Sequence, residues 1–193
     1  MKPHKILITG TFESGKTELI KLFIDDPRVF VIPEAARDIL SLDPSLQNKP
    51  EFQDILFRQQ IRNEALAEAS GKAIILCDRG ILDIIAFSSL LGVTVKNEWL
   101  LNSFGRYGDI MICNAGDIPY FAGNNQLDNQ SFRVNLDAEI RQIVKIFAEI
   151  DKTKPMVSEL RGTLEARRTF LNRHIDETIA IREGRRHHIE MDL

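Results

Sequence analysis

Residues 10–17 constrain the fold of this chain more than any other part of its sequence. They read GTFESGKT and fit the pattern GxxxxGK[ST], a glycine-rich loop that wraps around a polyphosphate. The apolar run 5–9 precedes this loop and the segment 18–24 has the composition of a helix, which is the strand–loop–helix context that the motif requires. The sequence therefore predicts a P-loop that binds a purine nucleoside triphosphate with Mg²⁺.

The chemistry of a polyphosphate explains the residue types in this loop. Glycines permit a tight turn whose backbone N–H groups converge on the phosphates. The Lys16 ammonium is expected between the β- and γ-phosphates, and the Thr17 hydroxyl is expected to ligate Mg²⁺. A helix that starts near Lys16 directs the positive end of its dipole at the anion. The expected nucleotide-binding residues are Gly10, Thr11, Phe12, Glu13, Ser14, Gly15, Lys16 and Thr17.

A carboxylate at the end of a second apolar run extends the predicted site. Residues 73–77 read as a buried strand, and Asp78, Arg79 and Gly80 follow it. Sites of open α/β sheets lie beyond the carboxyl ends of the strands, so Asp78 is expected to organise Mg²⁺ beside the P-loop. Arg79 is expected to stabilise the transferred phosphoryl group, and Gly80 allows the backbone to approach closely. The alternative is that Asp78 only caps a helix starting near Ile81.

Glu34 follows the apolar run 29–32, one residue after Pro33, much as Asp78 follows the run 73–77. At that strand end it would face the γ-phosphate from the acceptor side, where a carboxylate can take a hydroxyl proton. Arg37 follows one helical turn later, so both side chains can point into one cleft. A solvated glutamate at a helix N-terminus is the alternative.

Hydrophobic patterning predicts an α/β fold around these motifs. Continuous rather than alternating apolar runs indicate strands covered on both faces. Amphipathic helical patterns separate them, which is typical of a doubly wound parallel sheet. The polar stretch 115–131 fits neither pattern and is expected to be a functional or disordered loop. We predict one domain over 1–183 and a frayed tail over 184–193. The runs are 5–9, 29–32, 73–77, 109–113 and 155–160, and the helical patterns cover about 51–70, 136–147 and 164–179.

Composition narrows the class of protein. The chain has 193 residues, 44% of them hydrophobic, and a net charge of -3, which gives no global attraction to nucleic acid or to an anionic membrane. Neither a signal segment nor an apolar stretch of about 20 residues is present, so a cytoplasmic location is expected. Cys77 and Cys113 lie in apolar runs and are expected to be buried and unpaired. The oligomeric state stays open, with a homodimer as one option.

Four motifs together resemble a known family. They are GTFESGKT at 10–17, PEAAR at 33–37, FRQQ at 57–60 and CDRG at 77–80. They resemble the P-loop ATPase/kinase-like family that includes the ribosylnicotinamide kinase domain of bacterial NAD-biosynthesis regulators. GTP-binding trafficking proteins of eukaryotes and AAA-like ATP-binding proteins belong to the same family, and deoxynucleoside and thymidylate kinases are more distant. The resemblance covers the chain from Lys5 to about Ile175.

This resemblance implies a three-layer P-loop NTPase sandwich with five parallel strands in the order 2-3-1-4-5 and helices on both faces. It implies a lid over the phosphates at about 115–133, with Arg133 as the lid arginine, although this lid departs from the usual short form. It places the loop after the fifth strand, with Arg161 and Gly162, against the nucleotide base. In similar kinases a glutamine on the long helix reads the acceptor, which points to Gln59, with Asn63 beside it; amides bonded to a neighbouring loop are the alternative.

Three functions are compatible with these residues. In the first, the protein is a kinase that transfers the γ-phosphoryl group of ATP to a small acceptor such as a nucleoside or nucleotide, through Lys16, Glu34, Asp78, Arg79 and Arg133. In the second, it is a regulatory switch that binds GTP or ATP. Residues 114–117 (NAGD) weakly resemble the guanine-reading motif NKxD, without its lysine. In the third, it is a scaffold with a vestigial site, which the intact Lys16, Thr17 and Asp78 oppose.

Overall fold

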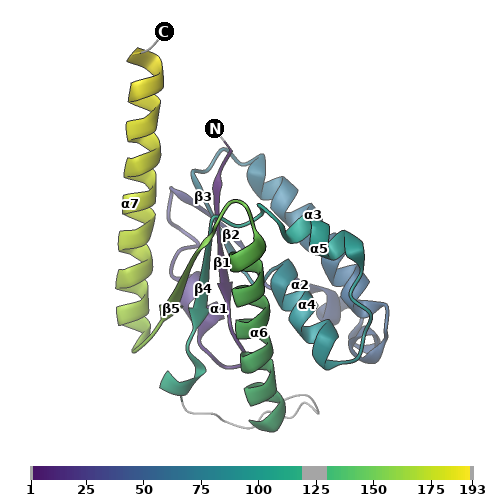
Figure 1. Cartoon of the computed structure of the whole chain (residues 1–193). Coiled ribbons are helices and arrows are strands. Elements are labelled where there is room, and N and C mark those ends of the chain that lie inside the picture. Colours follow the sequence, from purple (N-terminus) through teal and green to yellow (C-terminus); the bar gives the residue numbers. More distant parts are fainter. Residues whose placement is uncertain (1, 119–129, 192–193) are drawn as a thin grey trace.

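A five-stranded parallel sheet forms the centre of the protein (Figure 1). The computed structural model describes residues 2–118 and 130–191. All neighbouring strands pair in parallel, and their order β2-β3-β1-β4-β5 confirms the order that the family resemblance implied. The strands are β1 (His4–Thr9), β2 (Val29–Ile32), β3 (Ile74–Asp78), β4 (Asp109–Cys113) and β5 (Met156–Leu160).

Helices cover both faces of this sheet, as expected for a three-layer sandwich (Figure 1). Successive strand residues point to opposite faces. Leu7 and Ile75 therefore join one core with α3, α4 and α6, whereas Ile6 and Leu76 join a second core with α1 and α7. The helices are α1 (Lys16–Lys21), α2 (Ala35–Leu42), α3 (Phe52–Glu68), α4 (Ile81–Leu90), α5 (Asn97–Ser103), α6 (Gln130–Ile150) and α7 (Leu164–Met191), with 3₁₀ helices at Pro44–Asn48 and Ala115–Asp117.

Burial of the central strands explains their unbroken apolar sequence. Every residue of β3 and of β4 is buried, and so is every residue of β1 after His4. Cys77 and Cys113 are buried and free, as expected, and burial raises the pKa of both thiols. Within residues 2–118 and 130–191, no helix has the length and apolar character needed to cross a membrane.

The buried face of α3 is not the one that the apolar residues of the pattern at about 51–70 indicate. Leu66 belongs to that apolar pattern, but it is 64% exposed, whereas Gln53, Gln60 and Glu64 are buried. The cause is a polar network beneath the helix, in which Glu64 accepts hydrogen bonds from Lys5, Arg106, Tyr107 and Gln60. A charge buried in this way keeps its place because it is fully paired. Hydrophobicity alone therefore misplaces this face.

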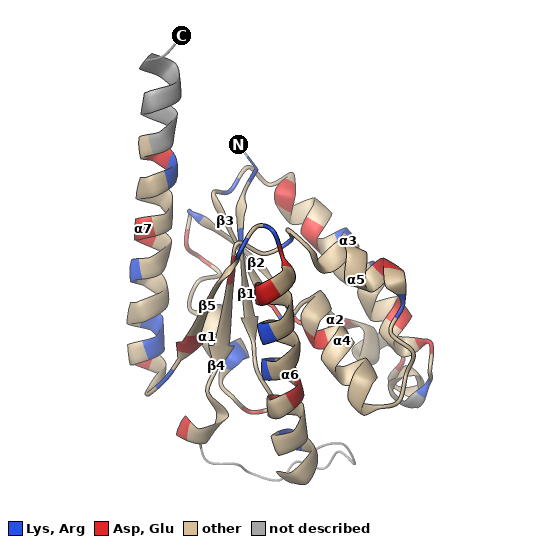
Figure 2. Cartoon of the chain, in the orientation of Figure 1, with Lys and Arg blue, Asp and Glu red and all other residues tan. Residues whose placement is uncertain are grey.

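Two expectations concern the C-terminal half of the chain. The predicted tail begins at residue 184, but the backbone stays helical as far as Met191, so that boundary falls inside α7. Gly184 does not end the helix because its backbone does not adopt a positive φ, and no proline follows it. Lys and Arg are interspersed with Asp and Glu along α7 (Figure 2). The central part of the predicted lid, residues 119–129, lies outside the described residues.

Candidate functional site: a phosphate loop beside a second cavity

The loop after β1 folds into a cradle, as its glycines require. Gly10 has φ +137°, and a Cβ there would lie 2.8 Å from the carbonyl oxygen of Cys113. Gly15 has φ +80°, and a Cβ there would lie 2.7 Å from Ile118 Cδ1. No other residue fits these two positions without strain. The loop bounds a cavity of about 210 Å³, lined by Phe12, Glu13, Ser14, Gly15, Lys16, Thr17, Glu18, Glu34, Arg37 and Arg79.

The Lys16 side chain lies folded against its own loop. Its Nζ donates to the Thr11 carbonyl at 2.6 Å and to Ser14 Oγ at 3.2 Å, and the residue is only 5% exposed. Burial, and next the charge of Arg79, lower the pKa of Lys16 to about 8. Burial therefore disfavours the charged form of Lys16 despite the nearby Asp78 and Glu34, and the negative charge of a bound phosphate would favour it.

This lowered pKa predicts a pH dependence for ATP affinity. Phosphates stabilise the ammonium, so binding raises the pKa of Lys16 and takes up a proton near pH 8. We expect the affinity to be complete below the free-state pKa of about 8. Above it, the affinity should fall by up to about tenfold per pH unit. Calorimetry between pH 7 and 9.5, in two buffers of different ionisation enthalpy, measures both the affinity and the proton uptake. An affinity that stays flat across this range would show that Lys16 does not titrate in this way.

Thr17 and Asp78 lie together, as the metal-site expectation requires. Thr17 Oγ1 donates to Asp78 Oδ2 at 2.8 Å, across the ends of α1 and β3. The other oxygen, Asp78 Oδ1, is buried and has no hydrogen-bond partner among the described residues. Burial raises the pKa of the Asp78 carboxyl, although Lys16 lowers it. A desolvated carboxylate oxygen beside a hydroxyl suits Mg²⁺, which takes oxygen ligands, so these residues fit the ion.

Helix capping is not the role of Asp78. The N-terminus of α4 is instead capped by Asp83, whose Oδ2 accepts a hydrogen bond from the N–H of Gly80 at 2.9 Å. Gly80 permits the close approach that we expected. A Cβ there would lie 2.3 Å from Tyr107 Oη, which accepts a hydrogen bond from the N–H of Ile81.

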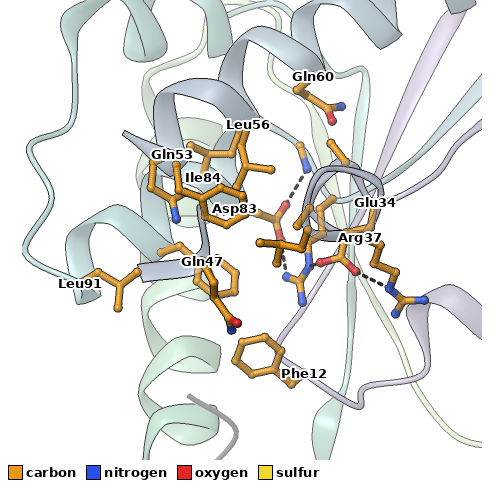
Figure 3. Close-up of a pocket in the computed structure, with 17 residues that line it drawn as sticks. Phe12, Glu34, Arg37, Gln47, Gln53, Leu56, Gln60, Asp83, Ile84 and Leu91 are labelled. Atoms are coloured by element: carbon orange, nitrogen blue, oxygen red, sulfur yellow. Dashed lines mark hydrogen bonds and ion pairs between the residues drawn. The ribbon is translucent and has the colours of Figure 1, made fainter. Parts of the chain in front are cut away.

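Arg79 lies at the centre of a buried charge cluster. Its Nε donates to Glu34 Oε1 at 2.8 Å, and its Nη1 donates to Asp83 Oδ1 at 3.1 Å; Figure 3 labels both carboxylates. Nη1 also donates to the Gly10 carbonyl at 3.1 Å. The guanidinium also lies over the rings of Phe12 and Phe87. Its backbone has φ +69°, a strained conformation for a residue other than glycine. Strain of this kind persists where the surrounding contacts fix it and is frequent at functional sites.

Glu34 is not a solvated helix terminus. Its side chain is 16% exposed, and Arg37 Nε donates to its Oε2 at 3.1 Å. Burial raises the pKa of Glu34, but Arg79, Lys16 and Arg37 together outweigh this effect, so the pKa lies below its usual value. The carboxylate is therefore ionised at neutral pH and available to accept a hydrogen bond. Arg37 Nη2 also donates to Thr17 Oγ1 at 3.0 Å, which joins α2 to the phosphate loop.

A second cavity of about 340 Å³ opens beside the first (Figure 3). Its wall is mainly apolar, with three glutamine side chains and the charged cluster at one end. Phe12, Glu34, Arg37 and Arg79 line both cavities. Its lining is Phe12, Glu34, Ala35, Ala36, Arg37, Leu40, Gln47, Phe52, Gln53, Leu56, Gln60, Arg79, Gly80, Asp83, Ile84, Phe87 and Leu91.

A sequence model described as an AAA domain matches residues 5–167. The chain belongs to this AAA domain family. Among curated proteins, it is similar to GTPase Der of Protochlamydia amoebophila (strain UWE25), with 28% identity over 91% of the chain. The chain spans only 39% of the length of that relative.

Solved structures share the fold of this AAA domain at low sequence identity. NadR protein in complex with NAD and AMP-PNP has a TM-score of 0.61 at 15% identity, over 82% of this chain and 44% of that one. NadR protein in complex with NR has a TM-score of 0.63 at 15% identity, over 82% and 45%. Deoxyadenosine kinase from M. mycoides has a TM-score of 0.62 at 10% identity, over 90% and 99%. The chain therefore has the fold of P-loop kinases.

Not every expected residue of the AAA domain faces the cavities. Arg133 is only 9% exposed, and its Nε donates to the Phe12 carbonyl at 3.1 Å, so it contacts the phosphate loop from behind. Its expected contact with phosphates remains a prediction. The Arg161 side chain is exposed and pairs with Glu159. Gly162 donates its N–H to Asp117 Oδ2 at 2.7 Å. Neither Arg161 nor Gly162 lines either cavity.

The glutamines that line the second cavity are not the predicted one. Gln59 instead donates to Asn63 within α3 at 2.7 Å, outside the cavity wall. Gln53 and Gln60 line the cavity. They lie three residues before and four residues after Leu56, a buried core residue of α3. Asp83 was not predicted from the sequence, although it lies five residues after Asp78, on the first turn of α4, where its Oδ1 accepts a hydrogen bond from Thr9 of β1.

Proposed function

We propose that this protein is a Mg²⁺-dependent kinase that transfers the γ-phosphoryl group of ATP to a hydroxyl of a small acceptor, such as a nucleoside or nucleotide. The observation that carries this proposal is the shared wall of the two cavities. Glu34, Arg37 and Arg79 border the phosphate cavity on one side and the larger cavity on the other. A group held in the larger cavity would reach the end of a triphosphate held by the loop.

The residues at this wall suit phosphoryl transfer. An acceptor hydroxyl forms a bond to the γ-phosphorus while the bond to the bridging oxygen of ADP breaks, and Glu34 takes the hydroxyl proton. Lys16 and Arg79 stabilise the negative charge on the transferred oxygens. Mg²⁺, held by Thr17 and Asp78, would neutralise charge on the β- and γ-phosphates.

The lining of the larger cavity indicates the kind of acceptor. Phe12, Phe52 and Phe87 offer apolar faces to a planar ring, while glutamine amides offer hydrogen bonds to its edge. The structural neighbours bind NR, in NadR protein, and dCMP and dCDP, in deoxyadenosine kinase. These ligands support a nucleoside-like acceptor for this chain.

The turn after β4 favours ATP over GTP. Asn114 Oδ1 accepts from the N–H of Gly116 at 2.8 Å, and Asp117 Oδ2 accepts from Gly162 and from Arg167. A guanine-reading side chain must direct its polar atoms at the base. Here internal partners engage one of the two polar atoms of each of these side chains. The alternative, a GTP- or ATP-binding switch without an acceptor, is favoured by the similarity to GTPase Der but leaves the larger cavity without a role.

Gln53 provides a test of the acceptor cavity. Its Oε1 is buried without a hydrogen-bond partner among the described residues. In Gln53→Leu we expect higher thermal stability, because an unsatisfied buried acceptor costs about 1–3 kcal/mol. We also expect about 10-fold or greater weakening of acceptor binding, since the cavity wall loses the polar side-chain amide of Gln53. Thermal melts without ligand and calorimetry with a nucleoside panel measure the two effects.

Gln59→Leu is the matched control on the same helix. Gln59 lies outside the cavity wall, so acceptor binding should stay at the wild-type level. Loss of binding in Gln59→Leu together with normal binding in Gln53→Leu would contradict this assignment of the cavity.

A further inference from the structure

Arg167 is a buried cation for which the proposed reaction has no role. It lies in the first turn of α7 and is only 1% exposed. Its Nη1 donates to the Ser14 carbonyl at 2.5 Å. Its Nη2 donates to the Asn114 carbonyl at 2.8 Å and to Asp117 Oδ2 at 3.2 Å. Burying a guanidinium is costly, so its position calls for a compensating function.

The contact with Ser14 sets the direction of the next backbone N–H. A trans peptide is planar, with its C=O and N–H on opposite sides. Because the Ser14 carbonyl is directed at Arg167, the N–H of Gly15 points away from Arg167. Ser14 and Gly15 line the phosphate cavity, and Arg167 does not, so it lies behind the loop. The N–H of Gly15 is therefore directed toward the cavity where a phosphate would bind.

The other half of the guanidinium fixes Arg167 to two further segments. Asn114 and Asp117 belong to the turn after β4, and Asp117 also accepts the N–H of Gly162 from the loop before α7. Arg167 thus ties the phosphate loop to both segments through charge-assisted hydrogen bonds. A guanidinium suits this task because its donors are fixed in one plane. A lysine ammonium also has three donors, but its flexible stem does not fix them in one plane.

We propose that Arg167 is a positioning residue of the phosphate cradle: it holds the Ser14 carbonyl away from the cavity so that the N–H of Gly15 donates to a polyphosphate, without itself touching the ligand. This inference rests on the nucleotide site of the proposed function but not on the acceptor. It concerns the binding of any linear polyphosphate, with or without a base.

The test compares Arg167→Met with Arg168→Met. Arg168 is the next residue on α7, and its side chain is 51% exposed. Calorimetry gives the Kd of ATP and of inorganic tripolyphosphate, and circular dichroism with thermal melts reports folding. We expect Arg167→Met to raise both Kd values by a similar factor of about 10- to 100-fold, because the loss lies in the cradle. Arg167→Lys should recover part of the loss, and Arg168→Met should match the wild type.

A fourth variant keeps the test decisive if Arg167→Met does not fold. Asp117 is partly exposed and anchors Arg167, so Asp117→Asn should weaken tripolyphosphate binding by about 3- to 10-fold. Wild-type Kd values in folded Arg167→Met, or in Asp117→Asn if the former is unfolded, would overturn the inference. Wild-type protein that binds neither phosphate would overturn the nucleotide site as well. Wild-type binding without transfer to any acceptor would reject only the proposed kinase function.

Discussion

Replacing Lys16 with alanine is expected to weaken ATP binding by about 100-fold or more and to reduce turnover by a larger factor, since the charge acts most strongly on the transferring phosphoryl group. Lys16 is buried, and its ammonium donates to the Thr11 carbonyl within the loop. No other lysine lines the phosphate cavity among the described residues, so none can replace it. Calorimetry for ATP, with and without Mg²⁺, measures the effect.

Unfolding of the Lys16→Ala variant should not be the cause of its weaker ATP binding and lower turnover. Burial lowers the pKa of Lys16 to about 8, which means that the folded protein disfavours its charge. Lys16→Ala should therefore melt at or near the wild-type temperature. Lys21→Ala is the matched control, because Lys21 lies on the same helix with its side chain 55% exposed. Undiminished affinity for both ATP and GTP in folded Lys16→Ala would reject the cradle as the nucleotide site.

Asp78→Asn is expected to lower Mg²⁺-dependent turnover by about 100- to 1,000-fold, while nucleotide binding in the presence of EDTA changes little. The asparagine can still accept from Thr17, but it loses the charge of the unpartnered oxygen that fits Mg²⁺. Turnover is measured against Mg²⁺ concentration, which should show a higher metal requirement in the variant.

The burial of the Asp78 carboxyl also predicts the thermal stability of the Asp78→Asn variant. Burial raises the pKa of the Asp78 carboxyl, so the metal-free fold gains nothing from its negative charge. Asp78→Asn should thus be at least as stable as the wild type at pH 7. Asp54→Asn, at a surface carboxylate paired with Lys96, serves as the control. A variant that only melts earlier, with unchanged turnover per folded molecule, would assign Asp78 to stability alone.

Much of the fold can be predicted from the sequence because its signals are local. The glycine spacing of the phosphate loop is fixed by positive φ values at Gly10 and Gly15, which other residues disfavour. Continuous apolar runs locate the strands, since both faces of the sheet are covered. Asp78 is the last residue of β3, which pairs in parallel with β1 before the loop, so its contact with Thr17 follows from the parallel topology.

The parts that sequence reasoning missed depend on contacts between distant residues. Glu64 draws α3 inward through Lys5 and Arg106, which no helical periodicity reveals. Gln53 and Gln60 are buried together with Glu64, and they line the cavity, whereas Gln59 does not. Arg167 reaches Ser14 across 153 positions of the chain, so its role appears only once α7 is packed.

Transfer of labelled γ-phosphate from ATP to an acceptor tests the central claim most directly. The protein is incubated with Mg²⁺, γ-labelled ATP and a panel of nucleosides, nucleotides and vitamin precursors, with Glu34→Gln in parallel. We expect label in one acceptor class, one ADP formed for each phosphorylated acceptor, and a loss of transfer in Glu34→Gln, which keeps the shape but not the charge of the carboxylate. Hydrolysis of ATP or GTP at the same rate with and without every acceptor, and no labelled acceptor, would contradict it.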